Sequence, residues 1–486
     1  MRFRTIGITC LIMILVLETG CAAAGGGNPN AFPAATPTTL FLVTAGLDST
    51  PTLTPFQPID EATPVPNAEP TATPTPAPTA DPNSILPTET QAQSFYVPPY
   101  APNPATVLTD NQTVTFALLG SDKRPGQTYF RTDTIILAAI RPATGQVTLI
   151  SVPRDLYVYI PTVGMDRINA AYEYGELYHY AGGGMALFKD TLLYNLGMRI
   201  DHIGIVDFDG FSNIVNTLGG LDVPVYCPYT DWHLINPNLD PEDENSWALY
   251  TVGPGVVHMD GALALWYARS RKKSSDFDRG RRSQEVIRAL YARALQTDAI
   301  SKIPQLYNDF KSAVITDMDL PGILKLAPLA LHLTNADIRS YYIGREDVTG
   351  WMTPGGASVL LQNGPVIQSL LQQALSPSPR TPDQAALTVE VRNGTNNEGW
   401  DALAAQRLNY AGYNTLLATA DRLDYSNSLL YDLGALPDIN RGNSLLAILG
   451  LPSTAFISAP AQGNENYVLI LGQDYRPCFD PTNMAP

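Results

Sequence analysis

Three short runs of apolar and β-branched residues decide the fold of the central part of the chain: Val114-Thr-Phe-Ala-Leu-Leu-Gly120, Thr134-Ile-Ile-Leu-Ala-Ala-Ile140 and Val147-Thr-Leu-Ile-Ser-Val152. Each run predicts a strand, because it is short and rich in residues that favour β structure. The second and third runs are separated by Arg141-Pro-Ala-Thr-Gly-Gln146. A short polar gap that contains glycine favours a hairpin between them.

Helices are predicted to alternate with strands further along the chain. Apolar residues recur at helical spacing over 168–175, 185–196, 208–218, 260–271 and 279–297. One more strand is predicted at 203–206. This alternation predicts an α/β fold, with a central α/β/α layered domain and a mixed sheet over residues 106–345. A connecting segment and linker over 346–384 is expected to lead to a smaller α/β domain over 385–476, and residues 477–486 form a tail.

The N-terminus has the pattern of an export signal. Arg2 and Arg4 precede the apolar run Ile6–Leu17, which is shorter than the roughly 20 residues that a transmembrane helix needs. A small residue before Cys21 and a flexible spacer after it resemble the processing site of bacterial lipoproteins. We therefore expect a signal over 1–21, a lipid on Cys21 and a location at the outer face of the cell membrane. An uncleaved short anchor is the alternative.

Residues 22–105 are rich in Pro, Thr and Ala, as in Thr71-Ala-Thr-Pro-Thr-Pro-Ala-Pro-Thr79. Of the 41 prolines, 18 occur by Pro104, and there is no lysine or arginine between Arg4 and Lys123. Such a segment buries too little apolar surface to offset the entropy lost on ordering, and its prolines favour extended conformers. The composition predicts a disordered, semi-extended stalk. A Pro-rich ligand for a recognition domain is the alternative.

The charge of the chain is distributed unevenly. The formal net charge is −16, which argues against nucleic acid as a partner, because phosphate backbones are bound by basic faces. Residues 267–284 nevertheless carry seven basic side chains against Asp276 and Asp278, namely Arg269, Arg271, Lys272, Lys273, Arg279, Arg281 and Arg282. The planar fork of arginine matches two phosphate oxygens at once. A solvated helix end that complements the helix dipole is the simpler alternative.

Carboxylates occur close to the ends of the predicted strands. Asp122 follows the first strand and Asp133 opens the second, and carboxylates at adjacent strand edges can share a cation. Mg²⁺ takes one or two carboxylates together with phosphate oxygens. Arg154 lies in Pro153-Arg-Asp155 at the end of the third strand. Each motif alone is explained by a turn with a local ion pair, but together they indicate a Mg-assisted phosphate or pyrophosphate site.

The ordered set of motifs resembles the LytR-CpsA-Psr family, enzymes that attach glycopolymers to the bacterial cell wall. The matching stretches are Gly-Ser-Asp-x-Arg at 120–124, Arg-Thr-Asp-Thr at 131–134, Ser-Val-Pro-Arg-Asp at 151–155, Arg-Ile-Asn-Ala-Ala-Tyr at 167–172, Asp-Phe-Asp-Gly-Phe at 207–211, Leu-Gly-Gly-Leu-Asp-Val at 218–223, Gly-Val-Val-His-Met-Asp-Gly at 255–261, Tyr-Ala-Arg-Ser-Arg-Lys at 267–272 and Asp-Phe-Asp-Arg-Gly-Arg-Arg at 276–282.

The resemblance implies a phosphotransferase that moves a phosphoglycan from a polyprenyl-pyrophosphate carrier to a peptidoglycan hydroxyl. It implies catalytic roles for Asp122, Asp133 and Arg154, with Mg²⁺ on the two carboxylates and Asp133 as the first choice of base. The pyrophosphate is expected to contact Arg154, Arg269, Arg271, Arg279, Arg282 and Gln284. The lipid is expected in a tunnel between the sheet and its helices, with Leu192, Leu193, Phe208, Phe211, Ile214 and Val215 as candidates; core packing is the alternative for each.

Two other functions stay open at this point. A polyprenyl-pyrophosphate hydrolase would use the same site with water as the acceptor, and a non-catalytic envelope-binding protein would bind lipid or wall without turnover. Residues 386–475 resemble the accessory domain of the LytR C-terminal type, through Val-Arg-Asn-Gly-Thr at 391–395 and Leu-Gly-Gln-Asp-Tyr at 471–475. Cys227 and Cys478 either pair or remain two free thiols.

Overall fold

A computed structural model describes residues 102–478, with gaps at 125–126, 128, 237–238, 241, 272–273, 298, 300–302, 312, 334–336, 378–386, 435–436 and 460–466. The predicted signal with Cys21, almost all of the predicted stalk and the end of the predicted linker lie outside these residues. None of the helices in the described part of the chain combines the length and the apolar character that crossing a bilayer requires.

The central domain is built on a six-stranded mixed sheet with the strand order β11-β6-β1-β2-β3-β12. The strands are β1 (Val114–Ser121), β2 (Thr132–Arg141), β3 (Gln146–Ser151), β6 (His202–Val206), β11 (Val314–Thr316) and β12 (Ile338–Tyr342). Strands β2 and β3 form the predicted antiparallel hairpin, and β1 runs antiparallel to β2 and parallel to β6. The mixed sheet predicted from the sequence is confirmed.

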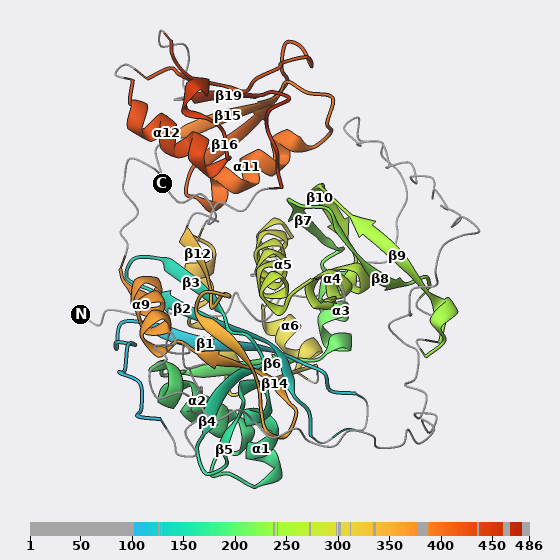
Figure 1. Cartoon of the computed structure of the whole chain (residues 1–486), viewed down its shortest axis with the longest axis vertical. Helices are drawn as coiled ribbons and strands as arrows, with labels where there is room; N and C mark the ends of the chain where they lie inside the picture. The colour runs from blue at the N-terminus through green and yellow to red at the C-terminus, as the bar shows by residue number, and fades with distance from the viewer. Residues whose placement is uncertain are drawn as a thin grey trace, which may run out of the picture.

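Helices cover both faces of this sheet, so that three layers form (Figure 1). Successive residues of a strand point to opposite faces: Phe116 and Leu118 belong to one core, and Ala117 and Leu119 belong to the other. The first core is covered by α3 (Phe208–Thr217), α4 (Gly261–Arg269), α5 (Asp276–Gln296) and α6 (Ile303–Phe310). The second is covered by α1 (Ala171–Leu177), α2 (Gly183–Leu196) and α9 (Gly364–Leu375).

Smaller elements surround the layers. A four-stranded sheet has the order β13-β14-β4-β5, and two hairpin-like pairs are β7 with β10 and β8 with β9. Their bounds are β4 (Leu156–Ile160), β5 (Gly164–Arg167), β7 (Leu221–Val225), β8 (Tyr229–Leu234), β9 (Trp247–Val252), β10 (Gly255–Met259), β13 (Val348–Met352) and β14 (Ser358–Gln362). Short helical turns are η1 (Ile168–Ala170), η2 (Glu244–Ser246), α7 (Leu320–Leu324) and α8 (Ala327–Ala330).

Helix α4 ends, and helix α5 begins, less than one turn earlier than predicted. Helix α4 ends at Arg269 instead of residue 271, and α5 begins at Asp276 instead of residue 279. The earlier start has a local cause, because the Ser275 side chain accepts a hydrogen bond from the Asp278 N–H and caps the helix. The acidic side chains in the first turn of α5 also complement the helix dipole. The loop 270–275 is consequently short.

The C-terminal domain contains a five-stranded sheet with the order β16-β15-β19-β17-β18. Its elements are β15 (Thr388–Asn393), α11 (Trp400–Tyr410), β16 (Asn414–Ala418), β17 (Leu429–Asp432), α12 (Ile439–Ile448), η4 (Ser453–Ala455), β18 (Phe456–Ser458) and β19 (Tyr467–Leu471). A disulfide between Cys227 and Cys478 joins it to the central domain, which answers the question that the sequence left open.

The two domains also touch through cationic and aromatic side chains. The guanidinium carbon of Arg288 lies 4.3 Å from the ring centre of Tyr410, and that of Arg407 lies 4.4 Å from the ring centre of Tyr226. Arg288 is on α5 and Tyr410 is on α11, so the C-terminal domain packs against the helix that also carries the predicted phosphate-binding arginines.

Candidate functional site

The predicted acidic residues lie where β1 ends and β2 begins, next to each other in the sheet. The Asp122 Oδ1 accepts a hydrogen bond of 2.9 Å from the backbone N–H of Arg131, and the Asp122 N–H donates to the Arg131 carbonyl at 3.2 Å. These two bonds close the loop between the strands. They bring Asp122 to the edge at which Asp133, in β2, presents its carboxylate.

Arg154 pairs directly with one of these acids. Its Nη1 lies 2.7 Å from the Asp133 Oδ1, and its Nε lies 3.5 Å from Asp155 and 3.8 Å from Asp276. The side chain is only 14% exposed. Burial opposes the charge of Arg154, but Asp133, Asp155 and Asp276 outweigh burial, so the pKa of Arg154 is raised. Arg154 is therefore held in its charged form within a largely enclosed site.

The first turn of α5 brings two further residues to the same place. Arg279 donates from Nη2 to the Asp133 carbonyl at 3.0 Å, and the same Nη2 lies 3.6 Å from the Asp276 Oδ1. Arg271, from the preceding loop, lies 3.2 Å from that Oδ1. The helix can approach β3 this closely because residue 280 is glycine: a Cβ there would lie 3.1 Å from the Ser151 Cβ.

Arg269 completes the group. Its guanidinium carbon lies 3.9 Å from the ring centre of Phe208, and it makes no hydrogen bond with another described residue. Burial lowers the pKa of Arg269, while Asp133 and Asp122 oppose that effect, so both carboxylates are within electrostatic reach of Arg269. We call Asp133, Arg154, Arg269, Arg271, Asp276 and Arg279 the cavity-mouth cluster.

A cavity of about 140 Å³ opens between the sheet and helices α3, α4 and α5. Its walls are mainly apolar, while Asp133, Arg269 and Arg279 line it at the polar end. The apolar walls are formed by side chains that include Leu118, Ile136, Phe211, Ile214, Val286, Ile287 and Leu290. Such a shape suits an amphipathic ligand with an anionic head group and a hydrocarbon tail.

The structure divides the six residues predicted for the lipid tunnel. Phe208, Phe211 and Ile214 line the cavity, and Val215 is fully buried in the core beside it. The prediction is wrong for Leu192 and Leu193, because both lie on α2, which covers the opposite face of the sheet. Helical periodicity identifies the apolar side of a helix, but it does not say which face of the sheet that helix covers.

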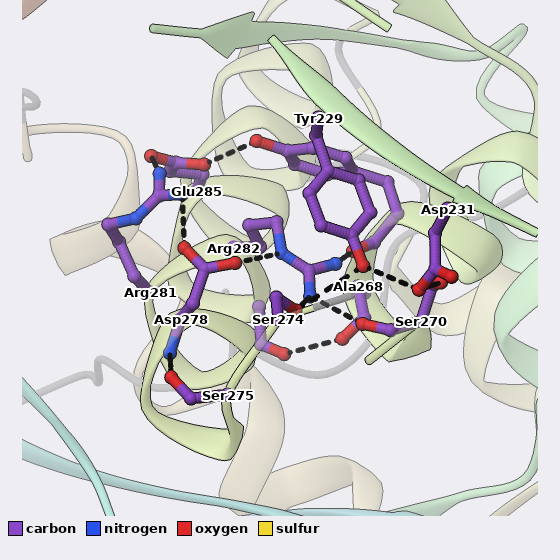
Figure 2. A network of polar contacts seen from close by, with 12 residues as sticks. Tyr229, Asp231, Ala268, Ser270, Ser274, Ser275, Asp278, Arg281, Arg282 and Glu285 are labelled. Carbon is purple, nitrogen blue, oxygen red and sulfur yellow. Dashed lines mark hydrogen bonds and ion pairs between the residues drawn. The ribbon is translucent and has the colours of Figure 1, made fainter. Parts of the chain in front are cut away.

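The structure also corrects the prediction for Arg282 (Figure 2). Arg282 is 0% exposed and donates from Nε to Asp278 at 3.0 Å and from its Nη groups to the carbonyls of Tyr267 and Ser270. Its guanidinium carbon lies 4.0 Å from the ring centre of Tyr229. All these partners belong to the protein, so Arg282 joins α4 to α5 and does not line the cavity.

Arg282 belongs to a second charged group on α5, visible in the same view (Figure 2). Arg281 pairs with Asp278 at 2.7 Å and with the buried Glu285, which also accepts a hydrogen bond of 2.9 Å from the Tyr267 hydroxyl. We call Asp278, Arg281, Arg282 and Glu285 the junction cluster, because it fastens α5 to α4 and to the loop between them.

Gln284 has a structural position as well. Its Nε2 donates to the Ser151 hydroxyl and to the Tyr341 carbonyl, both at 2.9 Å, and the side chain is buried. The neighbouring Ser283 lines the cavity instead. The family resemblance suggested Gln284, whereas the helical phase of α5 directs position 283 to the cavity.

Several residues near the site were not singled out from the sequence. Asp276 and Asp155 approach Arg154 from two sides, Arg167 lies 3.3 Å from the Asp155 Oδ1, and the Asn169 amide lies 3.5 Å from the Asp133 Oδ1. The signal available for Asp276 was its place at the start of α5, directly before an arginine-rich turn. Asp155 lay within a quoted motif in which a local ion pair was the simpler explanation, and nothing local assigned a partner to Asn169.

The residues present fit Mg²⁺ only in part. Within the described residues, no group of three or more His, Cys, Asp or Glu side chains is placed to hold a metal ion. Asp122 and Asp133 offer two carboxylates, although one oxygen of each already accepts a protein hydrogen bond or ion pair. Mg²⁺ commonly takes one or two carboxylates and completes its shell with water and substrate phosphates, so this pair is compatible with a metal that arrives with a phosphate ligand.

The fold and the site together define an α/β domain in which arginine and aspartate side chains adjoin a cavity with apolar walls. The profile of the LytR_cpsA_psr family matches residues 86–374, more than half of the 486 residues. The chain therefore belongs to the LytR_cpsA_psr family. Residues 386–475 match a second profile, described as LytR cell envelope-related transcriptional attenuator.

Individual relatives share about a third of their residues with this chain over the aligned stretches. The chain is 32% identical over 219 residues to the polyisoprenyl-teichoic acid–peptidoglycan teichoic acid transferase TagU of Oceanobacillus iheyensis, a match that covers 45% of this chain and 62% of that protein. It is 33% identical over 206 residues to a probable cell wall biosynthesis protein, LcpB, of Corynebacterium glutamicum, covering 39% and 44%. The aligned stretches thus span less than two thirds of either relative.

Among solved structures, that of Bacillus subtilis TagV is similar. It has 25% sequence identity and a TM-score of 0.43, and the match covers 56% of this chain and 100% of that chain.

Proposed function

We propose that this protein transfers a phosphate-linked glycopolymer from a polyprenyl-pyrophosphate carrier to a hydroxyl of peptidoglycan. Membership of the LytR_cpsA_psr family supports this proposal, as does the similarity to a relative that is named a polyisoprenyl-teichoic acid–peptidoglycan transferase. The observation that carries it is the cavity-mouth cluster, because guanidinium groups and carboxylates there adjoin a cavity with apolar walls. A polyprenyl pyrophosphate has the matching combination of charge and hydrocarbon.

The chemistry follows from these side chains. Arg154, Arg269 and Arg279 would neutralise the charge that grows on the phosphate oxygens, which is the main requirement of phosphoryl transfer. The acceptor hydroxyl oxygen would form a bond to the phosphorus next to the glycan, and the bond from that phosphorus to the bridging oxygen would break. Polyprenyl phosphate would leave, and Asp133 would accept the hydroxyl proton. Mg²⁺, when bound by Asp122 and Asp133, would add positive charge beside the phosphates.

The proposed place of the reaction is the outer face of the cell membrane. A lipid on Cys21 and an extended stalk over 22–105 would hold the domain close to a carrier that is itself in the bilayer, while leaving it free to reach the wall. Labelling the chain with a radioactive or clickable fatty acid in cells, with Cys21→Ser as the control, tests this anchor. Label retained by Cys21→Ser would contradict it.

The function is tested by reconstitution. The described domains are incubated with a polyprenyl-pyrophosphate-linked sugar, peptidoglycan fragments and Mg²⁺, and the products are separated by mass spectrometry. Sugar joined to peptidoglycan through a phosphodiester is the expected product. Free sugar phosphate without that product would favour the hydrolase, and binding without turnover would favour a non-catalytic protein. Omission of Mg²⁺ is expected to abolish turnover.

The apolar cavity provides a separate test of lipid binding. Ile287 lines the cavity on α5 and is only partly buried, so Ile287→Trp is expected to fill the cavity without unfolding the protein. Affinity for a long prenyl pyrophosphate should fall at least tenfold, and affinity for inorganic pyrophosphate should change little. Leu193→Trp, on the opposite face of the sheet, is the matched control and should bind the lipid normally. Equal losses in both variants would contradict the assignment of the cavity.

A further inference from the structure

Asp276 lies at the centre of the arginines in the cavity-mouth cluster. Its Oδ1 is 3.2 Å from the Arg271 Nη1 and 3.6 Å from the Arg279 Nη2, and its Oδ2 is 3.8 Å from the Arg154 Nε. The three arginines come from different places: the loop after β3, the loop after α4 and the first turn of α5. Asp276 is the carboxylate that these three side chains share.

Two of the three contacts, from Arg279 and Arg154, are longer than a hydrogen bond, whereas Arg271 donates from Nη1 to the Asp276 Oδ1 at 3.2 Å. The Arg154 Nε is buried and has no hydrogen-bond partner in the described structure, although the carboxylates of Asp155 and Asp276 lie 3.5 and 3.8 Å away. At these longer separations Asp276 attracts the guanidinium groups of Arg154 and Arg279 without accepting a hydrogen bond from them. The donors of Arg154 and Arg279 that are not bonded to Asp133 are left for phosphate oxygens, which form short bidentate bonds with arginine.

Asp155 is a second carboxyl group beside Asp276. Burial raises the pKa of Asp155, and its hydrogen bond to Asp276 raises it further, against Arg154 and Arg167. Burial also acts to raise the pKa of Asp276, but Arg279, the hydrogen bond from Asp155, Arg154 and Arg271 outweigh it and lower that pKa. Asp276, which faces all three arginines, is therefore the more acidic member of the pair.

We propose that Asp276 is a positioning residue that gathers Arg154, Arg271 and Arg279 around one pyrophosphate. Three guanidinium groups repel one another when no anion is bound, and a fixed carboxylate between them offsets that repulsion and sets their spacing before the ligand arrives. This proposal rests on the proposed function for the identity of the ligand, a pyrophosphate with a prenyl tail. The proposal thus explains why a negatively charged residue, Asp276, lies in a site for a negatively charged ligand.

The sign of the effect separates this proposal from simple electrostatics. If Asp276 were only a nearby negative charge, Asp276→Asn would strengthen the binding of an anion. If Asp276 positions the arginines, Asp276→Asn weakens binding, by roughly 10- to 100-fold, as when a side chain that orients metal ligands is removed. Asp276→Glu keeps the charge and is expected to restore part of the affinity.

Asp278 provides a matched control within the same helical turn. It pairs with Arg281 and Arg282 of the junction cluster, at 2.7 and 3.0 Å, and it does not line the cavity. Asp278→Asn is expected to lower the melting temperature while leaving the affinity of the folded protein for pyrophosphate within twofold of the original. The comparison of the two variants thus separates positioning from general loss of stability.

Calorimetry measures the binding of geranyl pyrophosphate to the protein with its central and C-terminal domains. The melting temperature of each variant is measured as well, and the transfer assay gives KM and kcat. The expected result is weaker binding and a higher KM for Asp276→Asn, partial rescue by Asp276→Glu and normal affinity for Asp278→Asn. Unchanged or tighter binding by Asp276→Asn would overturn the proposal, as would equal losses in the Asn and Glu variants.

The same measurements distinguish failure of this proposal from failure of the proposed function. If the unaltered protein binds geranyl pyrophosphate in an Asp276-dependent manner but transfers no sugar to peptidoglycan, the positioning role stands and the transferase function falls. If transfer proceeds and Asp276→Asn is indistinguishable from the unaltered protein in KM and affinity, the function stands and the positioning role falls.

Discussion

Helix α5 contributes residues to two charged clusters that look alike in the sequence and differ in structure. In the cavity-mouth cluster, Arg279 shares its acceptors with Arg154 and Arg271, and Arg269 makes no hydrogen bond with another described residue. In the junction cluster, Arg282 donates to four acceptors of the protein itself and is 0% exposed. The difference teaches that donors left available, and not the number of arginines, distinguish the proposed binding site.

The cause is the phase of the helix. Side chains three and four positions apart lie on one face of a helix, so Arg279, Ser283 and Ile287 follow one another along the cavity. Asp278, Arg282 and Glu285 follow one another along the face toward α4. A shift of one residue turns each side chain by about 100° around the helix axis, which would carry the residues of the junction cluster to the face that lines the cavity.

The largest expected effect is a loss of protein stability when the junction cluster is broken. Arg282→Ala leaves the carbonyls of Tyr267 and Ser270 without a donor and removes a partner of Asp278. Because breaking a buried ion pair leaves its partner uncompensated, the free energy of unfolding should fall by about 3–5 kcal/mol, measured by denaturant titration. Affinity of the folded variant for geranyl pyrophosphate should be unchanged. A loss of affinity at normal stability would instead restore the role predicted from the sequence.

The next largest effect is on turnover. Arg154→Ala removes a guanidinium group that adjoins Asp133 and the cavity-mouth cluster, and loss of one such donor typically lowers kcat by about 10²–10³-fold. The free energy of unfolding should change less than in Arg282→Ala. Arg199→Ala is the control, since Arg199 is a half-exposed arginine that lies 3.6 Å from Asp201. Turnover that survives Arg154→Ala would show that the site is assigned wrongly.

The smallest expected effect is on affinity, and it distinguishes binding of the ligand's pyrophosphate head group from binding of its prenyl tail. Phe208→Ala removes the ring beneath Arg269, and a partly desolvated cation–π contact contributes about 0.5–2 kcal/mol. Calorimetry with inorganic pyrophosphate should therefore show affinity reduced a few-fold. Phe211→Ala, which alters the cavity wall, should weaken only ligands with a prenyl tail. If the two variants respond identically to inorganic pyrophosphate, the contact between Phe208 and Arg269 does not support the head-group site.

The local elements followed closely from the sequence. The strands of the β2–β3 hairpin were predicted from β-rich runs around a glycine-containing gap, and α3 (Phe208–Thr217) matched its prediction because Asp207 caps its first turn. The start of α5 was missed, because its Ser275 cap precedes the first apolar residues of the periodic pattern. A capping residue acts within a single turn, so the start of a helix can be identified from the few residues around its cap.

The assignment of side chains to the site was less complete. Arg154, Arg269 and Arg279 were predicted and lie near Asp133, whereas Arg282 and Gln284 have partners within the fold. Leu192 and Phe208 are both apolar residues on helices beside the sheet, yet they lie on opposite faces of it. Which face a helix covers depends on the path of its connections, and periodicity within the helix carries no information about that path.

The sequence by itself determined the main strands and helices, the presence of a central and a C-terminal domain, and the chemistry present at the strand ends. These properties depend on neighbours a few residues away, through helical and strand periodicity and through turn residues. The sequence did not identify β13, β14 and α9, which lie within the segment expected as a connection over 346–384 and pack in the central domain. Only the tertiary structure decided which charges meet. Arg279 donates to the carbonyl of Asp133 across 146 positions of the chain, and Cys227 bonds Cys478 across 251. Such contacts form when whole layers pack, so they follow from burial of the two cores and not from any local pattern.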